Sequence, residues 1–303
     1  MTTANPSAPL RTLTPQTLKA LGRLELMAQQ AMAGYVQGRH RSTRQGYALD
    51  FAQHRAYVPG DDVKRIDWRA YAKADRYYIK QYEVQTSLRV LLAVDASGSM
   101  QYQGSKDDLS KWRYAQLLAT ACAYVALEQQ DNVGLAIMGQ PTPTWLNPRG
   151  LHEQFLAIAR HLEAHTPQGK TQLAAGLHEV AEYCPRRSMV MVITDGFERL
   201  DALGRALAHL RARRHEVLLL QVLSPDELEL PFTRVLQMRS LEDPGQRLRI
   251  DPTVIRGQYL QRLRGHLQAL EQLAGSYHCR YRRFATNVSL EQGLGEFLAP
   301  RRR

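Results

Sequence analysis

The sequence predicts an α/β protein in which helices cover both faces of a mostly parallel sheet. Short apolar segments rich in Val, Ile and Leu recur along residues 88–303, and they alternate with longer segments whose apolar residues repeat every three or four positions. Two of the apolar segments end on an aspartate, at Asp95 and Asp195. Polar groups are expected there, because open α/β sheets bind ligands at the carboxyl ends of their strands.

Strands and helices can be placed from these patterns. The expected strands are residues 88–94, 132–138, 188–194, 216–222 and 278–284. The expected helices that cover them include residues 110–130, 151–162 and 171–183. The strands are apolar at nearly every position, which is typical of a sheet covered on both sides.

Further along the chain, Asp201 is expected to cap a helix that reaches Arg213. Asp251 is expected to cap a long helix that begins with proline and reaches about Gly275. Between them, residues 232–250 alternate in polarity and turn at Asp243-Pro244-Gly245. We therefore expect a hairpin insertion near residues 226–251.

The N-terminal part differs in character. Residues 14–34 show an amphipathic helical pattern, and residues 35–86 are denser in Gly, Arg and aromatic side chains, with a strand-like alternation at 77–84. We expect two domains. Residues 1–87 would form a mixed subdomain, and residues 88–303 the α/β domain.

Composition limits the kinds of partner and the cellular location that can be expected for this chain. The 303 residues have a formal net charge of +11, which favours acidic partners, but no nucleic-acid-binding motif accompanies it, so no specific nucleic acid is expected. The apolar segments fall short of the roughly 20 residues of a membrane-spanning helix, and no secretory signal is evident. A cytoplasmic location is therefore expected, and the three widely spaced cysteines are expected to be reduced thiols.

Three oxygen-bearing side chains follow the first strand of the α/β domain. Asp95, Ser97 and Ser99 alternate along one turn, so their side chains can face the same point, while Ala96 and Gly98 leave room for backbone. Such a turn also has a purely structural explanation, because serines often cap the backbone N–H groups at the start of a helix.

Two later residues favour a metal site over that structural alternative. Thr171 comes shortly after Gly169 and just before a helical pattern, and Asp195 ends a second strand. With the first three residues they would provide five hard oxygen ligands from three loops, which suits Mg²⁺ or Mn²⁺.

This set of residues resembles the metal-ion-dependent adhesion site of von Willebrand factor A-type domains. The resemblance extends from residue 88 to the C-terminus and implies a Rossmann-like sheet with the ion at its top. It implies that the ion lies closest to Asp95, Ser97, Ser99 and Thr171, and that Asp195 acts directly or through water. In that family the usual role is to bind an acidic side chain of a protein partner.

A second resemblance comes from the N-terminal part. Residues 55–68 read R-A-Y-V-P-G-D-D-V-K-R-I-D-W, and together with residues 38–42 and 70–83 they resemble the signature block of the domain of unknown function 58 family. That resemblance implies an adaptor or chaperone-like partner of a MoxR-type AAA+ ATPase. Within the block, we favour a structural pairing of Arg55 with Asp67 or Asp61 over a second active site. His40 has no second His or Cys at metal-binding spacing.

Two functions remain open from the sequence. The favoured one is a non-enzymatic protein-binding module that uses the ion, with no catalytic residue. The alternative is a metal-dependent phosphate-ester hydrolase in which Asp95 and Asp195 hold an activated water and His40 or a nearby arginine assists. The alternative is weaker, because such enzymes gather more carboxylates or histidines, and the sequence has neither a G-x-x-x-x-G-K-[ST] nor a G-x-S-x-G motif.

Overall fold

The computed structural model describes residues 49–57, 66–68, 71, 76–84, 88–104, 109–139, 143–151, 153–170, 172–243, 245–288 and 290. Contacts divide the chain into a small compact unit, residues 37–87, and a larger unit that contains residues 88–303. The two units are described separately below. The helix expected at 14–34 lies outside the described residues.

The small unit contains an antiparallel pair of strands, β1 (Leu49–Ala56) and β2 (Tyr78–Val84). Aromatic side chains lie beside this pair. Tyr71 and Tyr77 stack with their ring centroids 4.5 Å apart, and Trp68 meets both rings edge-on. The backbone N–H of Asp67 donates to the carbonyl of Tyr78 at 2.8 Å, which joins the aromatic segment to β2.

The larger unit is built on a six-stranded sheet in the order β10-β7-β6-β3-β4-β5. Its strands are β3 (Arg89–Asp95), β4 (Asn132–Met138), β5 (Thr144–Arg149), β6 (Met189–Thr194), β7 (Glu216–Leu223) and β10 (Arg280–Ala285). All neighbours are parallel except β5, which runs antiparallel to β4. The five strands predicted for this sheet are therefore confirmed as β3, β4, β6, β7 and β10, and β5 is an additional strand.

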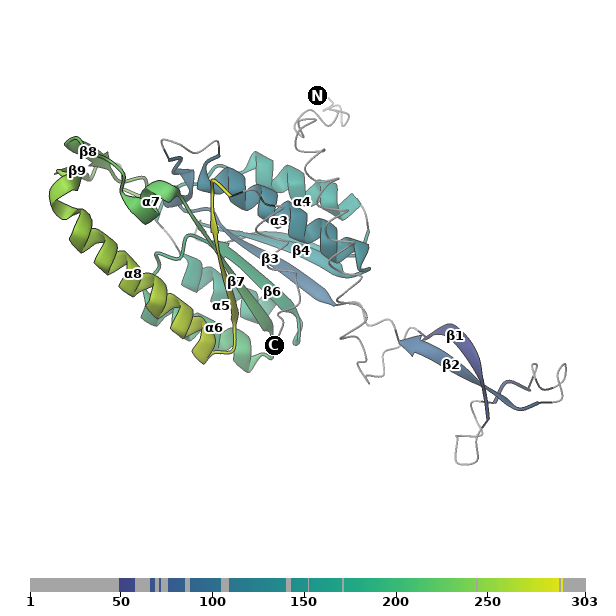
Figure 1. The fold of residues 1–303 in the computed structure, drawn as a ribbon. Coiled ribbons are helices and arrows are strands. Elements are labelled where there is room, and N and C mark those ends of the chain that lie inside the picture. Colours follow the sequence, from purple (N-terminus) through teal and green to yellow (C-terminus); the bar gives the residue numbers. More distant parts are fainter. Residues whose placement is uncertain are drawn as a thin grey trace, which may run out of the picture. The chain divides into compact units, whose positions relative to one another are not determined.

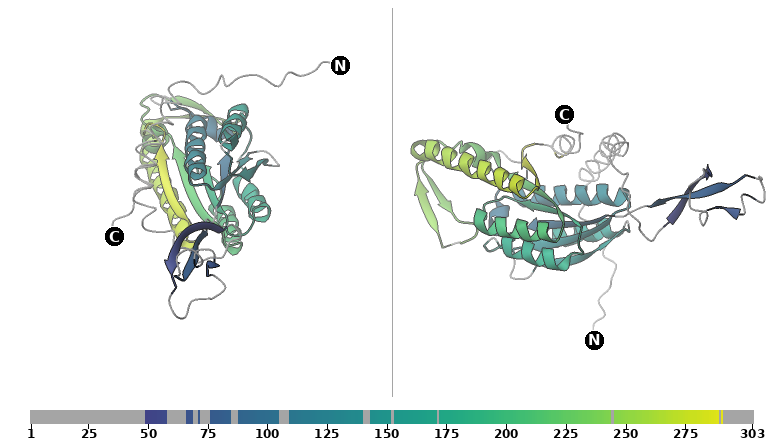
Figure 2. Two further views of the ribbon diagram at one scale, coloured as in Figure 1. Left: turned by 90° about the vertical axis from the view of Figure 1, so that its right-hand side faces the viewer. Right: turned by 90° about the horizontal axis from the view of Figure 1, so that it is seen from below.

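Helices cover both faces of this sheet (Figures 1 and 2). They are α3 (Lys111–Glu128), α4 (Glu153–Ala164), α5 (Leu173–Tyr183), α6 (Leu200–Ala212) and α8 (Pro252–Ser276). Two short helices, η2 (Gly98–Gln101) and α7 (Pro225–Glu229), follow the ends of β3 and β7. A separate hairpin, β8 (Leu236–Arg239) and β9 (Arg247–Ile250), precedes α8.

The alternation of side chains along β3 shows how the two layers share the core. Val90, Leu92 and Val94 pack with α3 and α4, whereas Leu91 and Ala93 pack with α5, α6 and α8. Because both faces are covered, the strands are apolar throughout. The predicted α/β fold class, with a mostly parallel sheet between two helical layers, is confirmed.

Two details differ from the sequence predictions. The helix expected to be capped by Asp201 begins at Leu200 with Arg199 as its cap residue, and Asp201 lies in the first turn. A carboxylate there still complements the positive end of the helix dipole, so the sequence pattern fits both placements. The missing strand, β5, contains Pro148, which disfavours a strand except at a sheet edge.

No helix in the described parts of the chain combines the length and apolar character needed to cross a membrane. The division into domains 1–87 and 88–303 stays a prediction.

Candidate functional site

The candidate site lies where β3 and β6 end side by side. In their parallel register Val94 lies opposite Ile193, so Asp95 and Thr194 are the next neighbours, and Asp195 follows. The other edge of β3 pairs with β4. The chain passes from β3 to β4 on one side and later returns as β6 on the other side of β3, so the strand order reverses here, at a topological switch point of the kind where α/β sheets bind ligands.

Asp95 is almost completely buried, with 1% of its surface exposed. Its Oδ1 accepts a hydrogen bond from the backbone N–H of Ser97 at 2.9 Å, and its Oδ2 accepts one from the Thr194 hydroxyl at 2.7 Å. Burial and, secondly, the negative charge of Asp195 raise the pKa of Asp95 to about 6, although the hydrogen bonds that it accepts oppose the increase. A cation nearby would stabilise the charged form of both carboxylates.

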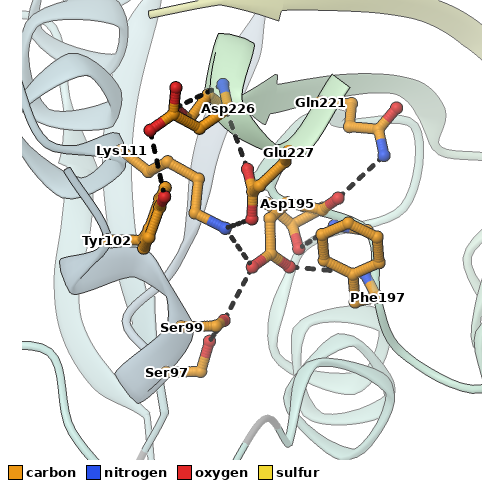
Figure 3. Close-up of polar contacts among 12 residues, drawn as sticks. Ser97, Ser99, Tyr102, Lys111, Asp195, Phe197, Gln221, Asp226 and Glu227 are labelled. Carbon is orange, nitrogen blue, oxygen red and sulfur yellow. Dashed lines mark hydrogen bonds and ion pairs between the residues drawn. The ribbon is translucent and has the colours of Figure 1, made fainter. Parts of the chain in front are cut away.

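Ser99 lies beside Asp195, and Ser97 lies beside Ser99 (Figure 3). The hydroxyl oxygens of Ser97 and Ser99 are 3.1 Å apart, and Ser99 donates a hydrogen bond to Oδ2 of Asp195 at 2.6 Å. The structure thus brings Ser97, Ser99 and Asp195 into one polar cluster. Thr194, which sequence analysis did not select, joins this cluster to Asp95.

Thr171 lies outside the described residues, so its predicted role stays a prediction. The loop just before it is close to the site. The backbone N–H of Gly98 donates to the carbonyl of Gly169 at 2.8 Å, and the N–H of Gln168 donates to the carbonyl of Ala96 at 3.0 Å. These two bonds join the loop after β3 to the loop that leads to α5.

Lys111 is the main site residue that sequence analysis missed. It is the first residue of α3 and is only 1% exposed. Its Nζ lies 2.9 Å from Oδ2 of Asp195 and 2.7 Å from Oε1 of Glu227 (Figure 3). Burial alone would lower the pKa of Lys111, but the two carboxylates outweigh that effect and raise it, so the amine is protonated.

Glu227 is held by the short helix α7. Ser224 and Glu227 form a capping box, in which the backbone N–H of Ser224 donates to Oε2 of Glu227 at 2.8 Å. The second carboxylate oxygen, Oε1, is thereby left for Lys111. Burial raises the pKa of Glu227, and the charge of Lys111 opposes that increase. In the sequence, the S-x-x-E pattern of Ser224 and Glu227 is the signal that could have indicated this capping box.

Asp195 is positioned by contacts on its backbone as well as its side chain. The amide of Gln221 on β7 donates to the Asp195 carbonyl at 2.7 Å, and the hydroxyl of Tyr281 donates to the Gln221 side chain at 2.5 Å. The backbone N–H of Phe197 donates to Oδ1 of Asp195 at 3.3 Å. Three neighbouring strands thus hold the second carboxylate in place.

The distances between the oxygen atoms of the cluster bear on whether a small divalent ion fits there. Oxygen distances of about 2.0 to 2.1 Å around Mg²⁺ place adjacent ligands of an octahedron roughly 3.0 Å apart. The 3.1 Å between the hydroxyls of Ser97 and Ser99 agrees with that spacing. Within the described residues, no group of three or more His, Cys, Asp and Glu side chains is arranged to hold a metal. An ion placed here would meet two carboxylates and hydroxyls, a set that fits Mg²⁺ or Mn²⁺ better than Zn²⁺.

Several other predicted residues can be placed only in part. His40 and Asp61 lie outside the described residues, and so does the side chain of Arg55. Asp67 is buried, with 9% of its surface exposed. The proposed pairing of Arg55 with an aspartate therefore stays a prediction.

Comparisons with known proteins agree with the second resemblance noted in the sequence. Residues 53–269 match the family described as Protein of unknown function DUF58. The chain is also 28% identical, over 249 residues, to the uncharacterized protein Rv1480 of Mycobacterium tuberculosis and to the uncharacterized protein Mb1516 of Mycobacterium bovis. In each case the match covers 79% of this chain and 76% of the relative.

Among solved structures, an aerotolerance-related membrane protein from Bacteroides fragilis is similar, with a TM-score of 0.49 and 18% identity over 70% of this chain and 96% of that one. The conserved hypothetical protein BatB from Bacteroides thetaiotaomicron has a TM-score of 0.44, with 17% identity over 69% of this chain and 96% of that one. The SpRpn10 VWA domain has a TM-score of 0.42, with 11% identity over 69% and 94%. None of these three, nor the two mycobacterial relatives, is named for a catalytic activity.

Proposed function

Because this chain belongs to the family described as Protein of unknown function DUF58, and because carboxylates and hydroxyls converge at its sheet edge, we propose that it is a non-enzymatic module that binds a protein partner through a metal ion. The observation on which the proposal rests is the cluster of Ser97, Ser99 and Asp195 beside Asp95.

In this proposal Asp95, Ser97, Ser99, Thr171 and Asp195 hold Mg²⁺ or Mn²⁺. When bound, the ion supplies a positive charge that attracts an acidic side chain of the partner. Two carboxylates and neutral hydroxyls do not satisfy such an ion fully, so one further anionic ligand is favourable. The residues of the chain orient the site, because Thr194 donates a hydrogen bond to the Asp95 carboxylate and Gln221 donates one to the backbone carbonyl of Asp195.

The surroundings of Lys111 favour a binding function for this cluster over a catalytic one. Its ammonium is shared by Asp195 and Glu227 and is buried, so it is not available as a base. It also reduces the negative charge that the ion would meet. We therefore expect modest ion affinity and a site that gains most from the added carboxylate of a partner.

The partner that we propose is a MoxR-type AAA+ ATPase, for which the chain would act as an adaptor or chaperone-like component. This part of the proposal rests on the signature block at residues 55–68. We place the module in the cytoplasm, and its three free, buried cysteines support a reducing compartment.

The test is isothermal titration of a purified MoxR-type ATPase from the same organism into the full chain. We expect binding in Mg²⁺ and its loss in EDTA. Asp95→Asn keeps the shape of the side chain but removes its charge, and it should weaken binding by more than about a hundredfold.

Asp201→Asn is the matched control, because Asp201 is an exposed carboxylate on α6 that pairs with Arg199 and Arg205, which are not residues of the cluster. It should bind as the unmodified chain does. Equal binding with and without EDTA, or normal binding by Asp95→Asn, would contradict the proposed use of an ion.

A further inference from the structure

The hairpin formed by β8 and β9 has two chemically different faces. Met238 lies opposite Leu248 on one face, and Arg239 lies opposite Arg247 on the other, where Arg249 follows at the next position. All five side chains are exposed. The hairpin is joined directly to α8 (Figure 1) and forms a sheet of its own, separate from the six-stranded one.

Both ends of the hairpin are fixed to the larger unit. At its base, Arg256 of α8 donates to the carbonyls of Leu230 and Phe232 at 3.0 and 2.7 Å. At its turn, the backbone of Leu241 packs against Gly98 in the loop of the candidate site. A Cβ atom at Gly98 would lie only 2.2 Å from the Leu241 carbonyl oxygen. The hairpin therefore reaches the site itself.

The turn is also held internally. The N–H of Asp243 donates to the Ser240 hydroxyl at 3.0 Å, and the N–H of Gln246 donates to the Asp243 carbonyl at 2.9 Å. The N–H of Ser240 donates to the Gln246 carbonyl at 3.1 Å. Such a turn keeps the two strands in register, so the hairpin is ordered before it meets any partner.

The basic face of the hairpin lacks a compensating charge. Like charges directly opposite one another destabilise an antiparallel pair, and Arg239 and Arg247 occupy such positions. In the part of the chain that the structure describes, none of Arg239, Arg247 and Arg249 has an acidic partner. An anionic ligand that covers this face would relieve the repulsion.

We infer that the basic face of the β8–β9 hairpin is a docking surface for an acidic segment of the protein partner, a segment that carries several Asp or Glu side chains. The inference rests on the proposed function, because the hairpin turn contacts the loop that would hold the ion. One carboxylate of the segment reaches the ion site, and others pair with the arginines. The surface would thus determine which acidic partners the site accepts.

A protein segment fits this surface better than a nucleic acid does. Proteins that bind single strands combine basic groups with aromatic rings on which bases stack. The described hairpin residues, 236–243 and 245–250, include no aromatic side chain. In addition, the hairpin turn contacts the loop of the candidate site, whose carboxylates would repel phosphates but can share a divalent ion with a carboxylate.

The test measures fluorescence anisotropy of a short labelled peptide in which Glu alternates with Ser, titrated with the full chain in Mg²⁺. The variant is Arg239→Glu combined with Arg249→Glu. It leaves Arg247 opposite a glutamate, so the hairpin gains an attractive pair and its fold is not put at risk. We expect affinity to fall by about tenfold or more.

The matched control combines Arg89→Glu with Arg149→Glu. Both arginines are exposed and lie at the start of β3 and the end of β5, at the end of the sheet opposite the candidate site. This control changes the net charge by the same amount and should leave affinity unchanged to within about twofold. Equal losses in both double variants, or no loss in either, would overturn the inference, as would tighter binding of a labelled oligonucleotide than of the peptide. If EDTA and Asp95→Asn abolish peptide binding while the hairpin variant binds normally, the ion-dependent function stands and only the hairpin inference fails.

Discussion

Lys111 places a positive charge beside Asp195, one of the two carboxylates that the proposed ion needs. Replacing it with methionine should raise the affinity for Mg²⁺ by about tenfold, because Coulomb repulsion between the ammonium and the ion would disappear. Isothermal titration of Mg²⁺ into the purified full chain measures this directly.

The same substitution should lower the free energy of unfolding without Mg²⁺ by about 3 to 5 kcal/mol, since it leaves two buried carboxylates without a counter-charge. Urea unfolding measures that loss. Combining Lys111→Met with Glu227→Gln should recover part of it, because one unpaired charge is removed. Weaker Mg²⁺ binding by Lys111→Met would show instead that the amine is needed to position Asp195.

The site residues differ in how far the sequence could predict them. Asp95, Ser97 and Ser99 lie within one turn, so their alternation alone placed them together. Lys111 contacts Glu227 across 116 positions of sequence, and no local pattern contains both residues. A lysine at the start of a helix is usually solvated, so only the folded arrangement shows that this one is buried and paired.

At the level of elements, the contact between the hairpin turn and the loop after β3 depends on the small size of Gly98. Sequence analysis expected this glycine to leave room for backbone, and the Leu241 carbonyl is the group that occupies that room. Gly98→Ala should therefore lower the free energy of unfolding by about 1 to 3 kcal/mol, because the turn must move to admit the methyl group. Urea unfolding at neutral pH measures the change.

Gly257→Ala is the control for this prediction. Gly257 lies on the exposed side of α8 with no atom within 4 Å of an added Cβ. Alanine there should stabilise the helix by about 0.5 to 1 kcal/mol, because alanine has the higher helix propensity. If both variants change stability in the same direction and by the same amount, the close packing at Gly98 is not the cause.

Elements with a strong pattern were predicted, whereas β5 was not, and its omission has a physical reason. The central strands are apolar throughout because both faces are covered, so a single property marks them. β5 lies at the sheet edge, where a proline is tolerated and polar positions face outward, and its sequence resembles that of a loop. Its place beside β4 comes from tertiary pairing that no local pattern encodes.

At the scale of the whole molecule, folding buries a histidine in surroundings that favour its neutral form. His215, just before β7, is fully buried, and the N–H of Ser188 donates to its Nδ1 at 3.2 Å. Burial lowers the pKa of His215 below the value of about 6.5 that an unfolded chain has. The unfolded state therefore binds more protons in acid, so the stability due to neutral His215 is complete above about pH 6.5 and is lost as the pH falls below it.

Urea unfolding between about pH 8 and about pH 5.5 should consequently show stability falling toward acid, and His215 should contribute up to about 1.4 kcal/mol per pH unit. His215→Asn offers a side-chain oxygen that can still accept from Ser188 and cannot titrate. Its stability should fall less steeply over the same range, even if it is lower at pH 8. Burial also lowers the pKa of His165 and His178, so part of the slope should remain. Parallel curves for the variant and the unmodified chain would mean that His215 takes up its proton without unfolding.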